Sequence, residues 1–146
     1  MVLWRISRHK DLNGTGGLRV SGRWHYAGQP VVYLSESAAA ALLEVCVHTA
    51  ANDVPPDFTL LRIEGPELKV VSLADGVLGE GWQADLERTR DLGTKWLREG
   101  TGALLRVPSA IVPATFNFLL NPMHRDAKKL RIVGTMRYPF DVRLKV

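Results

Sequence analysis

Residues 38–48 constrain the fold of this chain more than any other segment. Nearly every position there is apolar, and most are strong helix formers, which predicts a helix buried on most of its sides. Ser35-Glu36-Ser37 precedes the segment and supplies capping side chains. The segment also contains one carboxylate, Glu44. A buried carboxylate without a partner costs several kcal/mol or takes up a proton. Glu44 therefore has a cationic or hydrogen-bonding partner, or it faces a cleft.

The helical pattern alone leaves the purpose of Glu44 open. Its neighbours one turn earlier are Ala40 and Ala41, and such small side chains leave space over the carboxylate. A structural pair with an arginine and a functional carboxylate at a cleft fit this pattern equally well.

The remaining helices and strands are expected from runs of β-branched, aromatic and helix-forming residues. The glycine-rich residues 13–17 are expected to form a loop. A helix is predicted at 84–98, which Gly93 could interrupt, with a weaker one at 123–129. The order lacks a regular βαβ rhythm, so we predict one α+β domain over residues 1–146 with flanking helices. Strands are predicted at residues 4–6, 30–34, 58–63, 68–71, 104–112, 131–133 and 140–144.

The composition of the chain bears on the cellular compartment in which it is expected. The chain has 146 residues and a single cysteine, Cys46, so it cannot form an intrachain disulfide. No stretch of about 18 apolar residues occurs, and the N-terminus does not have the pattern of a signal peptide. We therefore expect a cytoplasmic protein with no membrane partner.

Several common functional motifs are missing from the sequence. It contains neither a dinucleotide-binding GxGxxG turn nor a Walker loop. Cys46 and His48 would point to nearly opposite sides of a helix, and the remaining histidines lack ligand spacing, so no metal is expected. The net charge is +4 with basic residues spread along the chain, which leaves nucleic-acid binding open without a motif to support it.

The segment upstream of the helix gives Glu44 a candidate setting. Ser21-Gly22-Arg23-Trp24-His25 places an arginine between glycine and tryptophan, and Tyr33 follows ten residues after that arginine. A strand, a capped turn and a helix would bring Tyr33 and Glu44 to one end of the sheet. Arg23 could instead form a surface salt bridge, and core packing is the ordinary role for Trp24 and Tyr26.

At this point the sequence resembles the RES domain family, named for an arginine, a glutamate and a serine. The resemblance covers essentially the whole chain. One departure is that the family often has Gly-Gly-Arg-Trp-Asn, where this chain has Ser21 and His25. The matching residues are Arg23, Glu44 in Ala-Leu-Leu-Glu-Val and Ser109 in Arg-Val-Pro-Ser-Ala, with supporting matches at Trp4-Arg5-Ile6, Val-Val-Tyr-Leu-Ser around Tyr33, Asn121-Pro122 and Phe140-Asp141-Val142-Arg143-Leu144.

The resemblance implies a toxin of a bacterial toxin–antitoxin pair. It implies a fold similar to that of the ADP-ribosyltransferase toxins, with mixed sheets and flanking helices. The implied substrate is NAD⁺, which such proteins degrade or use to transfer ADP-ribose, and no metal is implied. The implied partner is an antitoxin with an Xre-type helix-turn-helix domain that covers the active site. DNA would then be bound only through that antitoxin, and a homodimer remains open.

The chemistry of NAD⁺ cleavage suggests a role for each matching residue. Breaking the nicotinamide–ribose bond leaves positive charge on the ribose, which a carboxylate stabilises; we assign this role to Glu44. An arginine fork suits the pyrophosphate, with Arg23 preferred over Arg5. The ring of Tyr33 could stack on nicotinamide, or its hydroxyl could hold the ribose.

Two further residues have weaker assignments. Ser109 is a candidate NAD⁺ contact through the family match alone, and Asn121 is either another polar contact or a turn former. The sequence does not identify the acceptor, which could be water, phosphate or a protein. A nucleic-acid-binding or ribonuclease toxin and an inactive interaction domain both remain open as functions. The leading hypothesis requires Glu44 and Arg23 to line one shared hollow.

Overall fold

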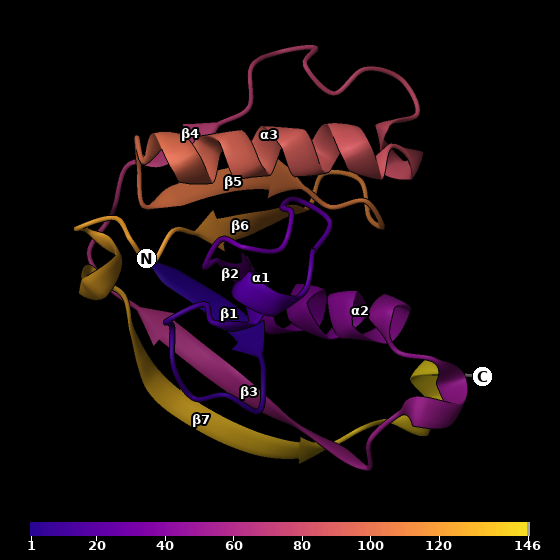
Figure 1. The fold of residues 1–146 in the computed structure, drawn as a ribbon. Helices are drawn as coiled ribbons and strands as arrows, with labels where there is room; N and C mark the ends of the chain where they lie inside the picture. Colours follow the sequence, from indigo (N-terminus) through magenta and orange to yellow (C-terminus); the bar gives the residue numbers. More distant parts are fainter. Residues whose placement is uncertain (146) are drawn as a thin grey trace.

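A mixed sheet of seven strands runs through the computed structural model, which describes residues 1–145 (Figure 1). The strands are β1 (Val2–Ile6), β2 (Val32–Ser35), β3 (Asp57–Glu64), β4 (Val70–Ser72), β5 (Leu104–Pro108), β6 (Phe116–Leu120) and β7 (Arg131–Pro139). Their order across the sheet is β4-β5-β6-β2-β1-β3-β7. Of the strands described, β4 and β5 alone pair in parallel.

The helices lie beside this sheet in two places. α3 (Leu86–Glu99) runs along the β5 side, and α2 (Ala38–His48) lies beside β1 and β2 (Figure 1). The N-terminus of α2 is capped by Ser37, whose hydroxyl accepts a hydrogen bond from the Ala40 amide at 3.0 Å. The short elements are α1 (Gly16–Arg19) and the 3-10 turns η1 (Ala51–Asp53), η2 (Trp82–Ala84), η3 (Ala127–Lys129) and η4 (Val142–Leu144).

Successive side chains of the central strands point to opposite faces of the sheet, and this divides the core between the two faces. Val32 and Leu34 of β2 belong to one buried cluster, whereas Tyr33 between them packs against the second. The second cluster lies beneath α3 and joins helix and sheet through Trp24, Val31, Trp96, Leu97, Leu105, Val107 and Leu119. Tyr33 and Ser35 therefore share the face on which Trp24 is buried.

Residues 21–26, the segment that carries Arg23, lie against α3. The Thr89 hydroxyl donates to the Arg23 carbonyl oxygen, and the Tyr26 amide donates to Thr94 Oγ1 at 2.9 Å. Gly93 faces the backbone of Trp24, with no room for a side chain between them. The helix continues through Gly93 without interruption, because this glycine provides a close approach rather than a break.

The prediction of an α+β fold agrees with this architecture, but several elements differ. Residues 38–48 are a helix as predicted, yet it is not buried on most sides, since Leu43 is 39% and Val47 54% exposed. Residues 104–112 form a strand only as far as Pro108, where β5 ends. Residues 123–129 contain only the turn η3, because Pro122 and the turn at Asn121 replace a helix start.

The loop and C-terminal predictions also need correction. Residues 16–19, expected to begin in a loop, form the short helix α1. The strand predicted at 131–133 continues to Pro139, and residues 140–144 are not a strand. The Asp141 carboxylate instead accepts from the Arg143 amide at 3.0 Å and closes the turn η4. The sequence patterns did not predict strand β6. Within residues 1–145, no helix has the length and hydropathy required to cross a membrane.

Candidate active site

A hollow of about 700 Å³ opens between α2, α3, the edge of β1 and the segment that carries Arg23. This volume is typical of ligand pockets. Arg5, Arg23, Tyr33 and Glu44 all line it, so the structure brings these four predicted residues together. A smaller recess of about 300 Å³ on α3, which includes Tyr26 and Asp91, contains none of the predicted site residues.

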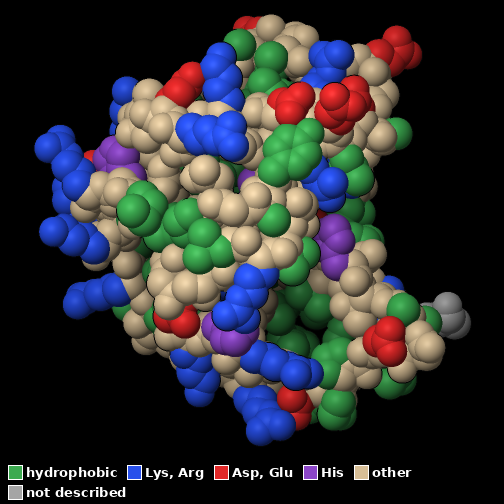
Figure 2. Space-filling model, in the orientation of Figure 1, with side chains coloured by type: hydrophobic (Ala, Val, Ile, Leu, Met, Phe, Trp, Pro, Cys, Tyr) green, Lys and Arg blue, Asp and Glu red, His purple; other side chains and the backbone are tan. Residues whose placement is uncertain are grey.

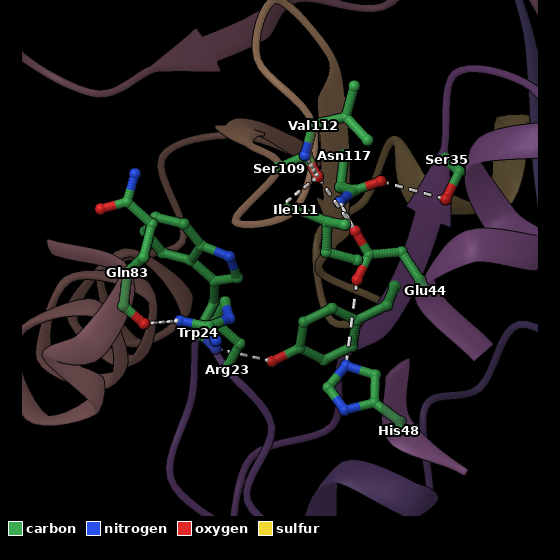
Figure 3. Close-up of polar contacts among 11 residues, drawn as sticks. Arg23, Trp24, Ser35, Glu44, His48, Gln83, Ser109, Ile111, Val112 and Asn117 are labelled. Carbon is green, nitrogen blue, oxygen red and sulfur yellow. Dashed lines mark hydrogen bonds and ion pairs between the residues drawn. The ribbon is translucent and has the colours of Figure 1, made fainter. Parts of the chain in front are cut away.

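Two neutral donors hold one oxygen of the Glu44 carboxylate. Oε1 accepts hydrogen bonds from Asn117 Nδ2 at 2.8 Å and from Ser109 Oγ at 3.3 Å (Figure 3). The second oxygen, Oε2, lies 3.8 Å from Nε2 of His48, one helical turn further along α2. The Glu44 side chain is 28% exposed. Oε2 is therefore the oxygen left for a ligand in the hollow.

The donors are themselves fixed by the sheet and by a hairpin loop. Asn117 is the cross-strand partner of Ser35, whose hydroxyl donates to Asn117 Oδ1 at 3.1 Å. This bond orients the Asn117 amide so that its NH₂ group faces Glu44. Ser109 Oγ accepts from the amides of Ile111 and Val112 at 3.1 and 3.2 Å, which leaves its proton for Glu44. Ser109 is 8% exposed and does not line the hollow, so its contact with the site is the bond to the Glu44 carboxylate.

The Tyr33 hydroxyl is occupied by protein partners. It accepts from the Trp24 amide at 3.1 Å and lies 2.7 Å from Nδ1 of His25. Nδ1 of His25 also accepts from the Gly22 amide, and Nε2 lies 3.2 Å from the Gly17 carbonyl oxygen. This pattern assigns the proton of the imidazole to Nε2, so that Tyr33 donates to Nδ1. Tyr33 thus presents its ring to the hollow rather than its hydroxyl.

Burial sets the protonation of this tyrosine–histidine pair. It raises the pKa of Tyr33, against opposing contributions from the Trp24 amide and two arginines. It lowers the pKa of His25, although hydrogen bonds with the backbone of Gly17 and Val20 partly offset that change. Both groups are therefore held neutral. His25, which stands where the family often has asparagine, links Tyr33 to Gly17 of the short helix α1.

Each of the two predicted arginines is held by a backbone carbonyl. Arg23 Nη1 donates to the Gln83 carbonyl oxygen at 2.9 Å (Figure 3). Arg5 Nη1 donates to the Asp11 carbonyl oxygen at 2.9 Å. Burial lowers the pKa of Arg5, with the Asp11 charge opposing the change. The salt bridge considered for Arg23 is not found among the described residues, and its remaining donors can serve a ligand.

Asn121 lies apart from these residues. Its Nδ2 donates to the Leu97 carbonyl oxygen at 3.2 Å, and its Oδ1 accepts from the Met123 amide at 3.0 Å. The side chain is buried and does not line the hollow. This placement matches the role of Asn121 as a turn former rather than as a contact for NAD⁺.

Sequence reasoning did not identify Asn117 or His48 as site residues. Asn117 lies in β6, where the apolar–polar alternation of Phe116-Asn117-Phe118 was the available signal. In the sequence, His48 bears only on the question of a metal site. In the described part of the chain, residues 1–145, no group of three or more His, Cys, Asp or Glu side chains could hold a metal ion.

Comparisons with known proteins show which family this chain is similar to. The family model described as RES domain matches residues 2–141. A protein named Toxin Res from Pseudomonas putida is 52% identical over 90% of this chain and 92% of its own length. A Prs ADP-ribosylating toxin from Sphingobium sp. is 35% identical over 97% of this chain and 94% of its own length.

A solved structure has a similar fold. The crystal structure of the M. tuberculosis MbcT–MbcA toxin–antitoxin complex contains a chain that superposes with a TM-score of 0.72. The match covers 94% of this chain and 84% of that one, at 20% sequence identity. This likeness confirms the predicted α+β fold, which the two chains share.

Proposed function

Because the chain belongs to the RES domain family, we propose that it is the toxin of a toxin–antitoxin pair and degrades NAD⁺. The reaction is cleavage of the bond between nicotinamide and ribose, with water or phosphate as acceptor. The observation that carries the proposal is the single hollow lined by both Glu44 and Arg23. A carboxylate and a guanidinium in one pocket suit a substrate whose sugar becomes cationic as the bond breaks and whose pyrophosphate is anionic.

Glu44 acts on the charge that develops as the bond breaks. The electron pair of the C–N bond leaves with nicotinamide, which departs as a neutral molecule, and the ribose becomes oxocarbenium-like. Glu44 Oε2 stabilises this cation or binds a ribose hydroxyl, while Oε1 stays fixed by Asn117 and Ser109. A water molecule or phosphate then attacks the ribose carbon and completes the reaction, giving ADP-ribose and a proton when the acceptor is water.

The neighbouring side chains position the two ends of the substrate. Arg23 binds the pyrophosphate through the guanidinium nitrogens that Gln83 does not occupy. Tyr33 contacts the nicotinamide or ribose with its ring, since its hydroxyl is committed to Trp24 and His25. Arg5, at the β1 side of the hollow, is the weaker candidate for the same pyrophosphate. Ser109 supports Glu44 rather than touching the substrate.

A second candidate function is transfer of ADP-ribose to a protein. It is favoured by one observation, the relative named Prs ADP-ribosylating toxin that covers nearly the whole chain. The two functions share the bond that is broken and differ in what attacks the ribose.

The partner of the proposed toxin is an antitoxin with an Xre-type helix-turn-helix domain that covers the mouth of the hollow. The pair works in the cytoplasm.

The test is an incubation of purified protein with NAD⁺ alone, in phosphate-free buffer and in phosphate. Release of free nicotinamide without any protein acceptor supports the proposed degradation, and the dependence on phosphate identifies the acceptor. Release that requires an added protein, with ADP-ribose attached to it, supports the second function. Absence of free nicotinamide without phosphate, with phosphate and with an added protein contradicts both candidate functions.

A further inference from the structure

A third arginine lines the hollow from helix α3. Arg90 lies in the second turn of α3, four residues after Leu86, so that both side chains project from the same stripe of the helix. Arg90 is half-buried, and its Nε donates to the Gly22 carbonyl oxygen at 2.8 Å. Nothing in the sequence distinguishes it from the neighbouring arginines of an amphipathic helix.

The charge of Arg90 has no direct acidic partner in the protein. Among residues 1–145, no carboxylate lies within ion-pair distance of it. Nor do its Nη1 and Nη2 atoms make a hydrogen bond within that range. The contrast with Arg88 is clear, because Arg88 pairs with Asp85 at 3.4 Å and donates to the Val77 carbonyl. A half-buried guanidinium with free donors is what an anionic ligand requires.

Arg90 and Arg23 also meet at the same short segment beside the hollow. Both are near enough to the Tyr33 hydroxyl to oppose the rise in its pKa that burial causes. They approach it along the same short segment, since Arg90 holds the Gly22 carbonyl next to Arg23. The hydrogen bond from Arg90 therefore brings its guanidinium group to the residue that precedes Arg23.

The charge balance of the hollow points to the same ligand chemistry. Its lining contains three arginines and one glutamate, which is an excess of two positive charges. A pyrophosphate carries two negative charges, and two arginine forks can bind its two phosphate groups separately.

We propose that Arg90 and Arg23 form a two-arginine clamp for the pyrophosphate of the dinucleotide, in which Arg90 binds through Nη1 and Nη2 while its Nε fixes the loop. This inference rests on the proposed function for the identity of the substrate. It adds a residue that determines specificity: the clamp selects dinucleotides over the smaller nicotinamide riboside, which has no phosphate.

The direct test is calorimetric binding of ADP-ribose to the full-length wild-type protein, to Arg90→Gln and to Arg88→Gln. Loss of charge-assisted hydrogen bonds predicts that Arg90→Gln weakens binding roughly 10- to 100-fold. Arg88→Gln is the matched control on the same helix and is expected to bind like the wild type. No ADP-ribose binding by the wild type, or equal affinity for all three proteins, overturns the clamp.

A second measurement separates binding from a purely structural role of the Gly22 bond. Arg90→Gln should raise KM for NAD⁺ and leave turnover of nicotinamide riboside near the wild-type rate. Equal losses for both substrates would mean that Arg90 only shapes the loop, which overturns the clamp. Arg90→Lys keeps the charge without the fork, so it should bind ADP-ribose with intermediate affinity even where Arg90→Gln is destabilised. Binding of ADP-ribose without any turnover of NAD⁺ would contradict the proposed function and leave the clamp standing.

Discussion

The Glu44 carboxylate is held at Oε1 by two hydrogen-bond donors that carry no charge. A carboxylate in an apolar helix could have been neutralised by an arginine, but its Oε1 is held by an amide and a hydroxyl instead. Neutral donors fix the position of a carboxylate without cancelling its charge. That combination stabilises a cation formed during a reaction, because the negative charge is already oriented before the positive charge develops.

At the residue scale, replacing Asn117 by Ala should reduce kcat more than it changes KM. The variant removes the shorter of the two bonds to Glu44 Oε1 and frees the carboxylate to turn. A misplacement of about 1 Å can cost about 100-fold in rate. Steady-state release of nicotinamide checks this, with Asn13→Ala, in an exposed loop, as the control. An unchanged kcat would show that Ser109 alone suffices to position Glu44.

Replacing Arg23 by Ala should act mainly on substrate binding. The variant removes a guanidinium that can hold the pyrophosphate before and during the reaction, so KM should rise while kcat changes little. Steady-state kinetics of nicotinamide release measure both constants, and Arg19→Ala, which changes an exposed arginine at the end of α1, is the control. A loss confined to kcat would move Arg23 from binding to the chemistry itself.

His25 should make the folded protein less stable in mild acid. Its pKa is lowered in the folded state by burial, from an ordinary value of 6.5. Below about pH 6.5 the unfolded chain therefore takes up a proton at this position that the folded chain does not, and the free energy of unfolding falls as pH falls. Urea unfolding of wild type and His25→Asn across this range tests the effect. An equally steep slope in the variant would assign the pH dependence to another group.

At the scale of elements, helix α3 fixes the position of the Arg23 segment, which packs closely against it. Gly93→Ala places a methyl group against the Trp24 backbone. Alanine normally favours a helix by about 0.5–1 kcal/mol, but this overlap should instead destabilise the fold by about 1–3 kcal/mol. Urea unfolding measures the change, and Gly16→Ala, which has open space around it, is the control. Stabilisation of Gly93→Ala would contradict the close packing.

Local sequence predicted the elements whose signals are local. The helix at residues 38–48 has both its cap and its composition within a single window, and its bounds were found as predicted. Strand β6 is short and follows a turn with Pro113, and its pairing with β2 and β5 is a long-range property. Without a predicted strand β6, Asn117 could not be predicted as a partner of Glu44. Its role depends on the strand register that places Asn117 opposite Ser35.

The residues of the hollow were predictable to different degrees. Arg23, Tyr33 and Glu44 lie near one another in the sequence, so a strand, a turn and a helix suffice to bring them to one end of the sheet. Arg90 reaches the same place only because α3 packs across the Arg23 segment. No pattern within residues 84–98 contains that information.

At the scale of the whole molecule, charge supports a local binding site over a nucleic-acid surface. The net charge is +4, but Lys and Arg side chains lie scattered over the face drawn in Figure 2, from its top and centre to its left and lower margins. Several arginines of the chain are paired with acids, including Arg62 with Glu64 and Arg137 with Asp57. Within the hollow the positive excess is concentrated instead, as a small anionic ligand requires.

The most direct test of the central claim is NAD⁺ turnover by Glu44→Gln. Glutamine keeps the size of the side chain and removes its charge, so the variant should keep the wild-type melting temperature. Nicotinamide release should fall roughly 100- to 1000-fold, the usual cost of losing one such electrostatic stabiliser. Glu36→Gln, which changes an exposed glutamate before the same helix, should match the wild type. Normal nicotinamide release by folded Glu44→Gln protein would contradict the account.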